Sequence, residues 1–200
     1  MNKLLNNTDL ELFKFINSHH NAFWDEIMYQ ISTTNIWIPL YVYIIFILFK
    51  EFKKKGWICL AALITLIFLS DKVSTFFKYF MKTLRPSHEI YLKSFIHLSK
   101  AGPGGLYGYV SSHASNFFSF TILLFIVLPK KYNWLKVVLL SCSVLVAYSR
   151  IYNGVHYPFD VLRGIALGSF MGLVFGVVLK YNKRLTTFFA KYSNNLVRYF

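Results

Sequence analysis

The sequence predicts an all-α fold: one domain, residues 1–200, built as a polytopic membrane bundle of about five transmembrane helices. Three observations support this prediction. The chain is 56% hydrophobic and 20% aromatic, but only 15% of its residues are charged. Apolar runs of helical length recur along it, and polar turns separate them. Basic residues flank these runs, as they do at the boundary of a membrane.

The formal net charge of +14 has a membrane explanation. In a soluble protein, 22 Lys and Arg against 8 Asp and Glu would suggest nucleic-acid binding. Here the basic residues lie beside apolar runs, so we expect anionic lipid head groups as partners and no nucleic acid. Cys59 and Cys142 fall inside apolar runs and are interpreted as small buried residues.

Two short helices are expected ahead of the first crossing. Thr8 and Glu11 form a possible capping box that would begin the first helix, and residues 21–32 would form the second. The apolar face of the first helix suggests that it lies on the membrane surface. We interpret both as interfacial helices without a chemical role.

Five crossings are predicted, at residues 36–49, 56–80, 112–128, 134–148 and 161–179. Several are near the lower limit, because a helix needs about 20 residues to cross a bilayer. The basic turns at 50–55 and 130–131 share one side with the tail after Lys180, and we assign that side to the cytoplasm. The connections 84–110 and 149–160 then face outwards together with the N-terminal segment.

The fifth crossing has a ridge of glycines. Gly164, Gly168, Gly172 and Gly176 recur at every fourth residue, which places them on one helix face. Small residues there allow close approach of a neighbouring helix, so we expect a structural role. Apolar residues on one face of 185–199 predict a C-terminal interfacial amphipathic helix.

Three polar stretches occur at the outward ends of the crossings. The first holds Lys78 and Arg85, which would share a helix face with Asp71 if all three are helical. Charged groups at a membrane edge are costly and mark function, although both cations could also be snorkelling anchors.

The second stretch is Ser111, Ser112 and His113, at the start of the third crossing. A serine that caps a helix is structurally ordinary, and a histidine there can be purely structural. The free backbone N–H groups of a helix start also bind phosphate.

The third stretch, residues 149–160, contains Arg150, His156 and Asp160. Arginine offers a planar fork of donors for phosphate oxygens. Histidine can be a nucleophile or a proton carrier, and an aspartate four residues later can fix its tautomer. The alternative is a polar loop that caps a membrane helix.

The order and spacing of these stretches resemble a known family. Lys78-x6-Arg85-Pro86, Ser111-Ser112-His113 and Ser149-Arg150-x5-His156-x3-Asp160 are similar to the three signature motifs of the type-2 phosphatidic acid phosphatase superfamily, which includes vanadium haloperoxidases. The resemblance covers about residues 71–168. The family's second motif usually reads Pro-Ser-Gly-His, whereas Val110 and Ser112 stand in place of Pro and Gly here. Serine keeps the backbone N–H, provided that the position does not need a positive φ.

The resemblance implies a mechanism. His156 would attack phosphorus and form a phosphohistidine, Asp160 would orient it, and His113 would protonate the leaving oxygen. The implied phosphate-binding residues are Lys78, Arg85, Ser111, Ser112 and Arg150. We expect no metal and no cofactor, because three cations and a helix N-terminus supply the positive charge that phosphoryl transfer needs. A metal site of His113, His156 and Asp160 has no support from ligand spacing.

The implied function is hydrolysis of the terminal phosphate of a membrane lipid, at the periplasmic face of a bacterial inner membrane. We favour undecaprenyl diphosphate, with lipid A or phosphatidylglycerophosphate as alternatives, since the motifs bind only the phosphate that all three share. Specificity is expected from the 87–110 loop, through His88, Glu89, Lys93, His97 and Lys100, and from the N-terminal helices. An alternative of another class is a non-catalytic lipid transporter or scaffold, which would not need this set of polar residues.

Overall fold

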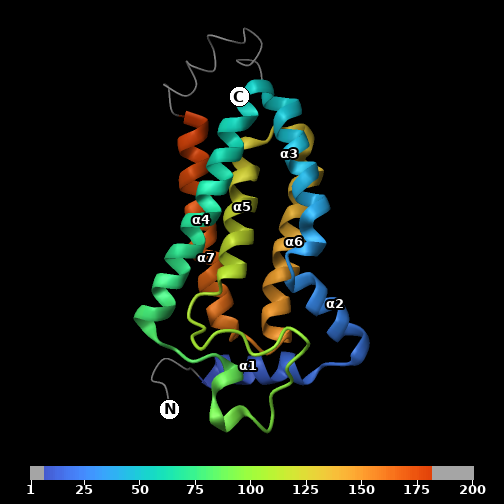
Figure 1. Ribbon diagram of the computed structural model, residues 1–200, viewed down its shortest axis with the longest axis vertical. Helices are drawn as coiled ribbons and strands as arrows, with labels where there is room; N and C mark the ends of the chain where they lie inside the picture. The colour runs from blue at the N-terminus through green and yellow to red at the C-terminus, as the bar shows by residue number, and fades with distance from the viewer. Residues whose placement is uncertain (1–6, 182–200) are drawn as a thin grey trace.

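The computed structural model describes residues 7–181, which form an all-α bundle (Figure 1). Five helices run along its length: α3 (Ile38–Phe52), α4 (Gly56–Met81), α5 (Ser112–Val127), α6 (Asn133–Tyr152) and α7 (Pro158–Tyr181). Two shorter ones, α1 (Asn7–Ser18) and α2 (Ala22–Ser32), lie at one end. Short 3-10 turns are η1 (Asn35–Trp37), η2 (Lys53–Lys55), η3 (Pro86–His88), η4 (Ile90–Leu92) and η5 (Lys130–Tyr132). The helix expected over 185–199 lies outside the described residues.

Three helical stretches are long and apolar enough to cross a membrane: Asn35–Met81, Lys130–Tyr152 and Pro158–Tyr181. The first contains both α3 and α4, which reverse direction at the lysines of η2 (Figure 1). The shorter apolar helix α5 lies alongside them. Large apolar side chains such as Phe68 and Phe170 point outwards, as expected for contact with lipid. The predicted membrane helix bundle is confirmed, and the chain is a multi-pass membrane protein.

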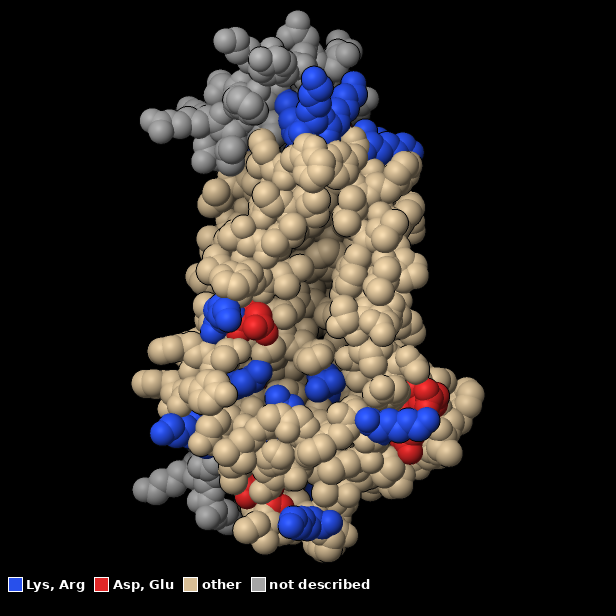
Figure 2. All heavy atoms as spheres, in the orientation of Figure 1, with Lys and Arg blue, Asp and Glu red and all other residues tan. Residues whose placement is uncertain are grey.

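The ends of the bundle are chemically different. The basic turns η2 and η5 and the end of α7 lie together at one end, as predicted (Figure 1). Figure 2 shows Lys and Arg side chains gathered there. The 84–110 connection, the α6–α7 loop and α1 lie at the opposite end.

The helix boundaries on either side of the α6–α7 connection differ from the sequence-based expectation. Helix α6 continues to Tyr152 and α7 begins at Pro158, so only residues 153–157 connect them. We expected α6 to stop at 148, because the following residues are polar. They continue the helix because Ser149 and Arg150 point into the protein, where they are buried, and proline suits the first turn of α7.

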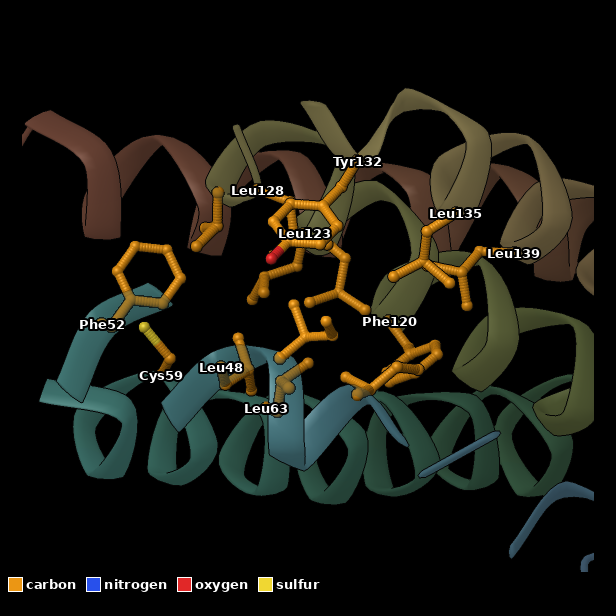
Figure 3. Close-up of a cluster of buried hydrophobic side chains, with 14 of the residues drawn as sticks. Leu48, Phe52, Cys59, Leu63, Phe120, Leu123, Leu128, Tyr132, Leu135 and Leu139 are labelled. Atoms are coloured by element: carbon orange, nitrogen blue, oxygen red, sulfur yellow. The ribbon is translucent and has the colours of Figure 1, made fainter. Parts of the chain in front are cut away.

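The main apolar core lies towards the basic end. Figure 3 shows side chains from α3, α4, α5, η5 and α6 interdigitating, among them Leu48, Phe52, Cys59, Leu63, Phe120, Leu123, Leu128, Tyr132, Leu135 and Leu139. The Tyr132 hydroxyl donates to Glu51 at 2.7 Å, and Lys131 pairs with the same carboxylate. The core therefore ends in a polar cluster at the basic end of the bundle.

The glycine ridge of α7 packs against α5, as predicted. Gly164, Gly168, Gly172 and Gly176 are all buried. A Cβ added at Gly164 would lie 2.6 Å from the backbone oxygen of Ser111, the N-cap residue of α5, and one at Gly168 would overlap the backbone oxygen of Ser115 in its first turn. Because the two backbones approach so closely, the first turns of α5 and α7 are held side by side.

Candidate active site

Lys78 and Arg85 reach the site by different routes. Lys78 lies near the end of α4, half-buried, and donates a hydrogen bond to Ser112 Oγ. Helix α4 ends at Met81, and Lys82 takes a left-handed conformation with φ of 49°. Arg85 is extended, with φ −71° and ψ 156°. The expectation of a helical Arg85 sharing a face with Lys78 was therefore wrong, because a residue before proline, here Pro86, avoids the helical region.

Arg85 is held by a short antiparallel bridge. Its N–H donates to Leu106 O at 3.1 Å, and its side-chain Nε donates to Tyr107 O at 3.1 Å. The N–H of Gly108 donates to Thr83 O at 2.9 Å. Arg85 as a whole is 8% exposed.

Two glycines of the connection contact this arginine directly. A Cβ at Gly104 would overlap the guanidinium, and Gly104 has φ of +68°. A Cβ at Gly108 would lie 2.9 Å from Asp160 Oδ2 and 3.1 Å from Arg85 Cγ. We did not single out either glycine from the sequence. The only signal was the density of glycine in the connection, which does not say what the glycines contact.

The second motif begins α5. Ser111 is its N-cap residue and is fully buried, and its Oγ has no hydrogen-bond partner among the described residues. Ser112 Oγ instead bonds Ser74 Oγ at 2.7 Å and accepts from Lys78. The Ser112 hydroxyl thus positions Lys78 against the start of α5.

The two departures from the family's second motif have different structural consequences. Ser112 is the first residue of α5 and is not among the positions with positive φ, so it does not need the freedom of glycine. Val110 does have a positive φ, 64°. Proline cannot adopt that angle, so the family's usual proline is incompatible with the left-handed backbone that Val110 has here.

The third motif folds around its histidine. The N–H groups of Val155 and His156 both donate to Arg150 O at 3.2 Å. The His156 side chain is 1% exposed, and its Nδ1 lies 3.7 Å from Asp160 Oδ2. This distance is longer than a hydrogen bond, so Asp160 lies beside the ring without bonding it directly. Asp160 Oδ2 also accepts from the Tyr157 N–H at 3.3 Å. The Nδ1 edge of the ring therefore faces Asp160, and its Nε2 edge faces the other way.

The electrostatics of the site keep His156 neutral. Burial lowers the pKa of its imidazole well below the ordinary value, and nearby positive charges lower it further. Those charges belong to Lys78, Arg85, Arg150 and His113. His113 is exposed to solvent and lies within electrostatic range of the same three cations. In Figure 2, Lys and Arg side chains lie at the lower end of a hollow in the apolar surface.

All the predicted site residues lie at one end of the bundle. The second and third motifs are joined directly, because the Ser111 N–H donates to Asp160 O at 3.0 Å. The negative charge of Asp160 opposes the effect of burial on the pKa of Arg85, which burial lowers. His156 therefore lies within electrostatic range of Lys78, Arg85, Arg150 and His113, the last of which stands in the first turn of α5.

The N-terminal helix contributes to this geometry, although we assigned it no chemical role. Asp9 is buried and accepts a hydrogen bond from the Phe159 N–H at 2.9 Å, in the first turn of α7. Phe13 packs edge-on against Tyr157, with ring centroids 5.4 Å apart. Burial raises the pKa of Asp9, with smaller opposing effects from Phe159 and Arg163. Helix α1 therefore braces the segment that carries His156.

The fold and this site define a membrane-embedded phosphatase. Residues 55–184 match the family model described as the PAP2 superfamily, and the chain belongs to that superfamily. It is similar to the lipid A 4'-phosphatase of Bacteroides thetaiotaomicron, with 32% identity over 178 residues, 88% of this chain and 78% of that protein. It is also similar to the undecaprenyl-diphosphatase of Sulfolobus acidocaldarius, with 32% identity over 169 residues, 83% and 76% of the two chains.

A solved structure shows the same fold. The crystal structure of Aquifex aeolicus LpxE superimposes with a TM-score of 0.70 and 25% identity, covering 90% of this chain and all of that one. The predicted family and enzyme class are confirmed: the chain is a phosphoric ester hydrolase whose relatives act on lipid phosphates. The family match therefore favours an enzyme over the alternative of a non-catalytic lipid transporter or scaffold.

Proposed function

We propose that the enzyme hydrolyses a phosphate monoester of a lipid A-type glycolipid and releases inorganic phosphate. Undecaprenyl diphosphate is the second candidate substrate. This order reverses the sequence-based preference for undecaprenyl diphosphate. The relative named for lipid A covers slightly more of both chains than the relative named for the diphosphate. Both substrates present a terminal phosphate, which the same group of cations would bind.

The observation that carries the catalytic proposal is the neutral, buried His156 among three cations. A neutral imidazole has a free lone pair, and the ring nitrogen turned away from Asp160 is the one able to attack. In the first step, His156 Nε2 forms a bond to phosphorus while the bond from phosphorus to the lipid oxygen breaks. His113, exposed at the site, gives its proton to that oxygen.

The second step regenerates the enzyme. A water molecule gives a proton to His113 and attacks the phosphohistidine, so the bond between nitrogen and phosphorus breaks and inorganic phosphate leaves. Lys78, Arg85 and Arg150 stabilise the equatorial oxygens throughout. The buried Ser111 hydroxyl, which has no partner among the described residues, is available to the same oxygens.

The charge distribution of the bundle supports a location for the site. We place the basic end of the bundle in the cytoplasm and the site on the external face of a bacterial inner membrane. Single cysteines test this in a background without Cys59 and Cys142. Ser94→Cys, exposed near the site, should react with an impermeant maleimide on intact spheroplasts, whereas Lys54→Cys in η2 should react only after lysis. The reverse pattern would invert the topology.

The catalytic proposal is tested by phosphate release from purified protein in detergent. The substrates are lipid A, undecaprenyl diphosphate and phosphatidylglycerophosphate, and the wild type is compared with His156→Gln. A matched control is His19→Gln, which changes an exposed histidine at the end of α1. Equal release by His156→Gln and the wild type would contradict the mechanism. A faster rate on the diphosphate than on lipid A would contradict the substrate proposed first.

A further inference from the structure

A second group of polar side chains lies apart from the predicted catalytic residues. It joins His20 in the α1–α2 connection, Asp25 in α2 and His97 in the loop that follows η4. One potential ligand atom from each of the three residues lies within 4.8 Å of the other two. Within residues 7–181, this is the group of His, Cys, Asp and Glu side chains close enough to share a metal ion.

The contacts inside this group bring electron-donating atoms together. His97 Nε2 lies 2.9 Å from Asp25 Oδ1. The ring of His20 stacks on the ring of His97, with centroids 3.6 Å apart and an angle of 1° between the planes. Face-to-face stacking is an unfavourable arrangement for aromatic rings. Each neutral ring keeps a lone pair on one nitrogen, so the two rings can bind one cation together if they turn out of the stack.

We propose that His20, Asp25 and His97 bind a divalent metal ion of the zinc class. Imidazole nitrogen with one carboxylate oxygen is a donor set that suits Zn²⁺, and three protein ligands leave a fourth position for water. Tetrahedral coordination at usual bond lengths separates ligand atoms by roughly 3.4 Å. His97 Nε2 and Asp25 Oδ1, now 2.9 Å apart, must therefore separate slightly, while His20, whose ligand atom lies within 4.8 Å of theirs, adjusts to the same spacing. His20 is exposed and lies in a connection between helices, which allows it to make this movement.

Neighbouring residues already orient two of the three ligands. The Tyr152 hydroxyl donates to Asp25 Oδ1 at 2.9 Å. The Asn17 side chain brackets the backbone of His97, accepting from its N–H at 2.8 Å and donating to its C=O at 2.9 Å. Hydrogen bonds of this kind fix metal ligands in place and raise affinity.

A bound ion would connect the N-terminal helices to the surroundings of the catalytic loop. The His97 carbonyl packs on Gly154, where an added Cβ would lie 2.5 Å from it. Gly154 belongs to the five-residue loop that carries His156. The ion would therefore stabilise this end of the protein without touching the phosphoryl group. We expected no metal from the sequence, because fixed cations and a helix N-terminus supply the charge that phosphoryl transfer needs. That reasoning concerned the active site and did not consider His20, Asp25 and His97.

Zinc binding by the full chain in detergent tests the proposal. Protein stripped with chelator is titrated with Zn²⁺ by calorimetry and with Co²⁺ by visible absorption. The wild type and His19→Ala should bind one ion per chain, with the absorption bands of tetrahedral Co²⁺, and Zn²⁺ should raise their Tm. His20→Ala should bind at least about tenfold more weakly and lose the rise in Tm.

The outcomes separate clearly. His20 is exposed, so its replacement should leave the fold intact. The Tm of His20→Ala without metal, compared with that of the stripped wild type, checks this. No binding by the wild type, or equal binding by His20→Ala, would overturn the proposal. None of these measurements depends on phosphatase activity. The metal-site proposal can therefore be wrong while the catalytic proposal holds, and the catalytic proposal can be wrong while the metal site exists.

Discussion

Replacing Gly108 by alanine should damage the active site with a single methyl group. The new Cβ would lie 2.9 Å from Asp160 Oδ2, 3.1 Å from Arg85 Cγ and 3.5 Å from Arg85 Cα. Ordinary contacts would require the first two atoms to move by roughly 0.5 Å each. The Arg85 backbone cannot yield easily, because its bridge to the 106–108 segment fixes it. The displacement therefore falls on the two side chains.

The expected size follows from this geometry. A misplacement approaching 1 Å costs roughly 100-fold in rate, so we expect kcat/KM to fall by about 10- to 100-fold, or ~1.4–2.7 kcal/mol in the barrier. Overpacking should also lower stability by about 1–3 kcal/mol. Alanine lowers the conformational entropy of the unfolded chain, which offsets roughly 0.4–1 kcal/mol of this loss of stability. The loss in rate should exceed what unfolding at the assay temperature can explain.

The same loop offers a matched control. A Cβ at Gly105 would meet no atom within 4 Å, so Gly105→Ala should keep both the rate and the Tm. Phosphate release from the preferred lipid gives kcat/KM, and thermal unfolding in detergent gives Tm. If Gly108→Ala and Gly105→Ala hydrolyse the lipid within twofold of each other, the packing of the loop does not position Arg85 and Asp160 for catalysis.

Three further predictions concern the helices, pH and metal ions. Gly168→Ala forces a methyl group onto the Ser115 carbonyl and should lower unfolding stability by about 1–3 kcal/mol, whereas Ala166→Leu on the exposed face of α7 should leave the Tm nearly unchanged. Because the folded pKa of His156 lies below its unfolded value of about 6.5, the unfolded state binds more protons below that pH. Stability should then fall on acidification below about pH 6.5, by up to ~1.4 kcal/mol per pH unit, and a Tm–pH curve of His156→Asn with the same slope as wild type would contradict this. Hydrolysis should persist in chelator, since fixed cations supply the charge; complete loss that magnesium restores would show otherwise.

Local spacing explains what the sequence could predict. The glycines of α7 recur every fourth residue, so their shared face follows from helix geometry alone, and the structure packs that face on α5. The catalytic candidates Arg150, His156 and Asp160 also lie within a short segment. Their spacing carries the family resemblance, whatever the surrounding fold.

Contacts between distant segments explain what it could not. The conformation of Arg85 depends on a bridge to residues 106–108, which no local sequence pattern predicts. Gly108 is informative only once Asp160 is known to lie beside it. His97 and Lys100 were expected to read the substrate head group. The structure also pairs them with Asp25 and Glu26 of α2, at 2.9 and 2.6 Å, contacts that the sequence did not indicate.

The serine pairs between α4 and α5 have a consequence for how the enzyme meets its lipid. Ser70 bonds Ser115 at 2.8 Å and Ser74 bonds Ser112 at 2.7 Å. The helices run in opposite directions, so sliding one along the other would break both bonds at once. The position of Lys78 along the bundle axis is thereby fixed relative to the start of α5. A substrate phosphate must reach Lys78 at that position, whatever the rest of the molecule carries.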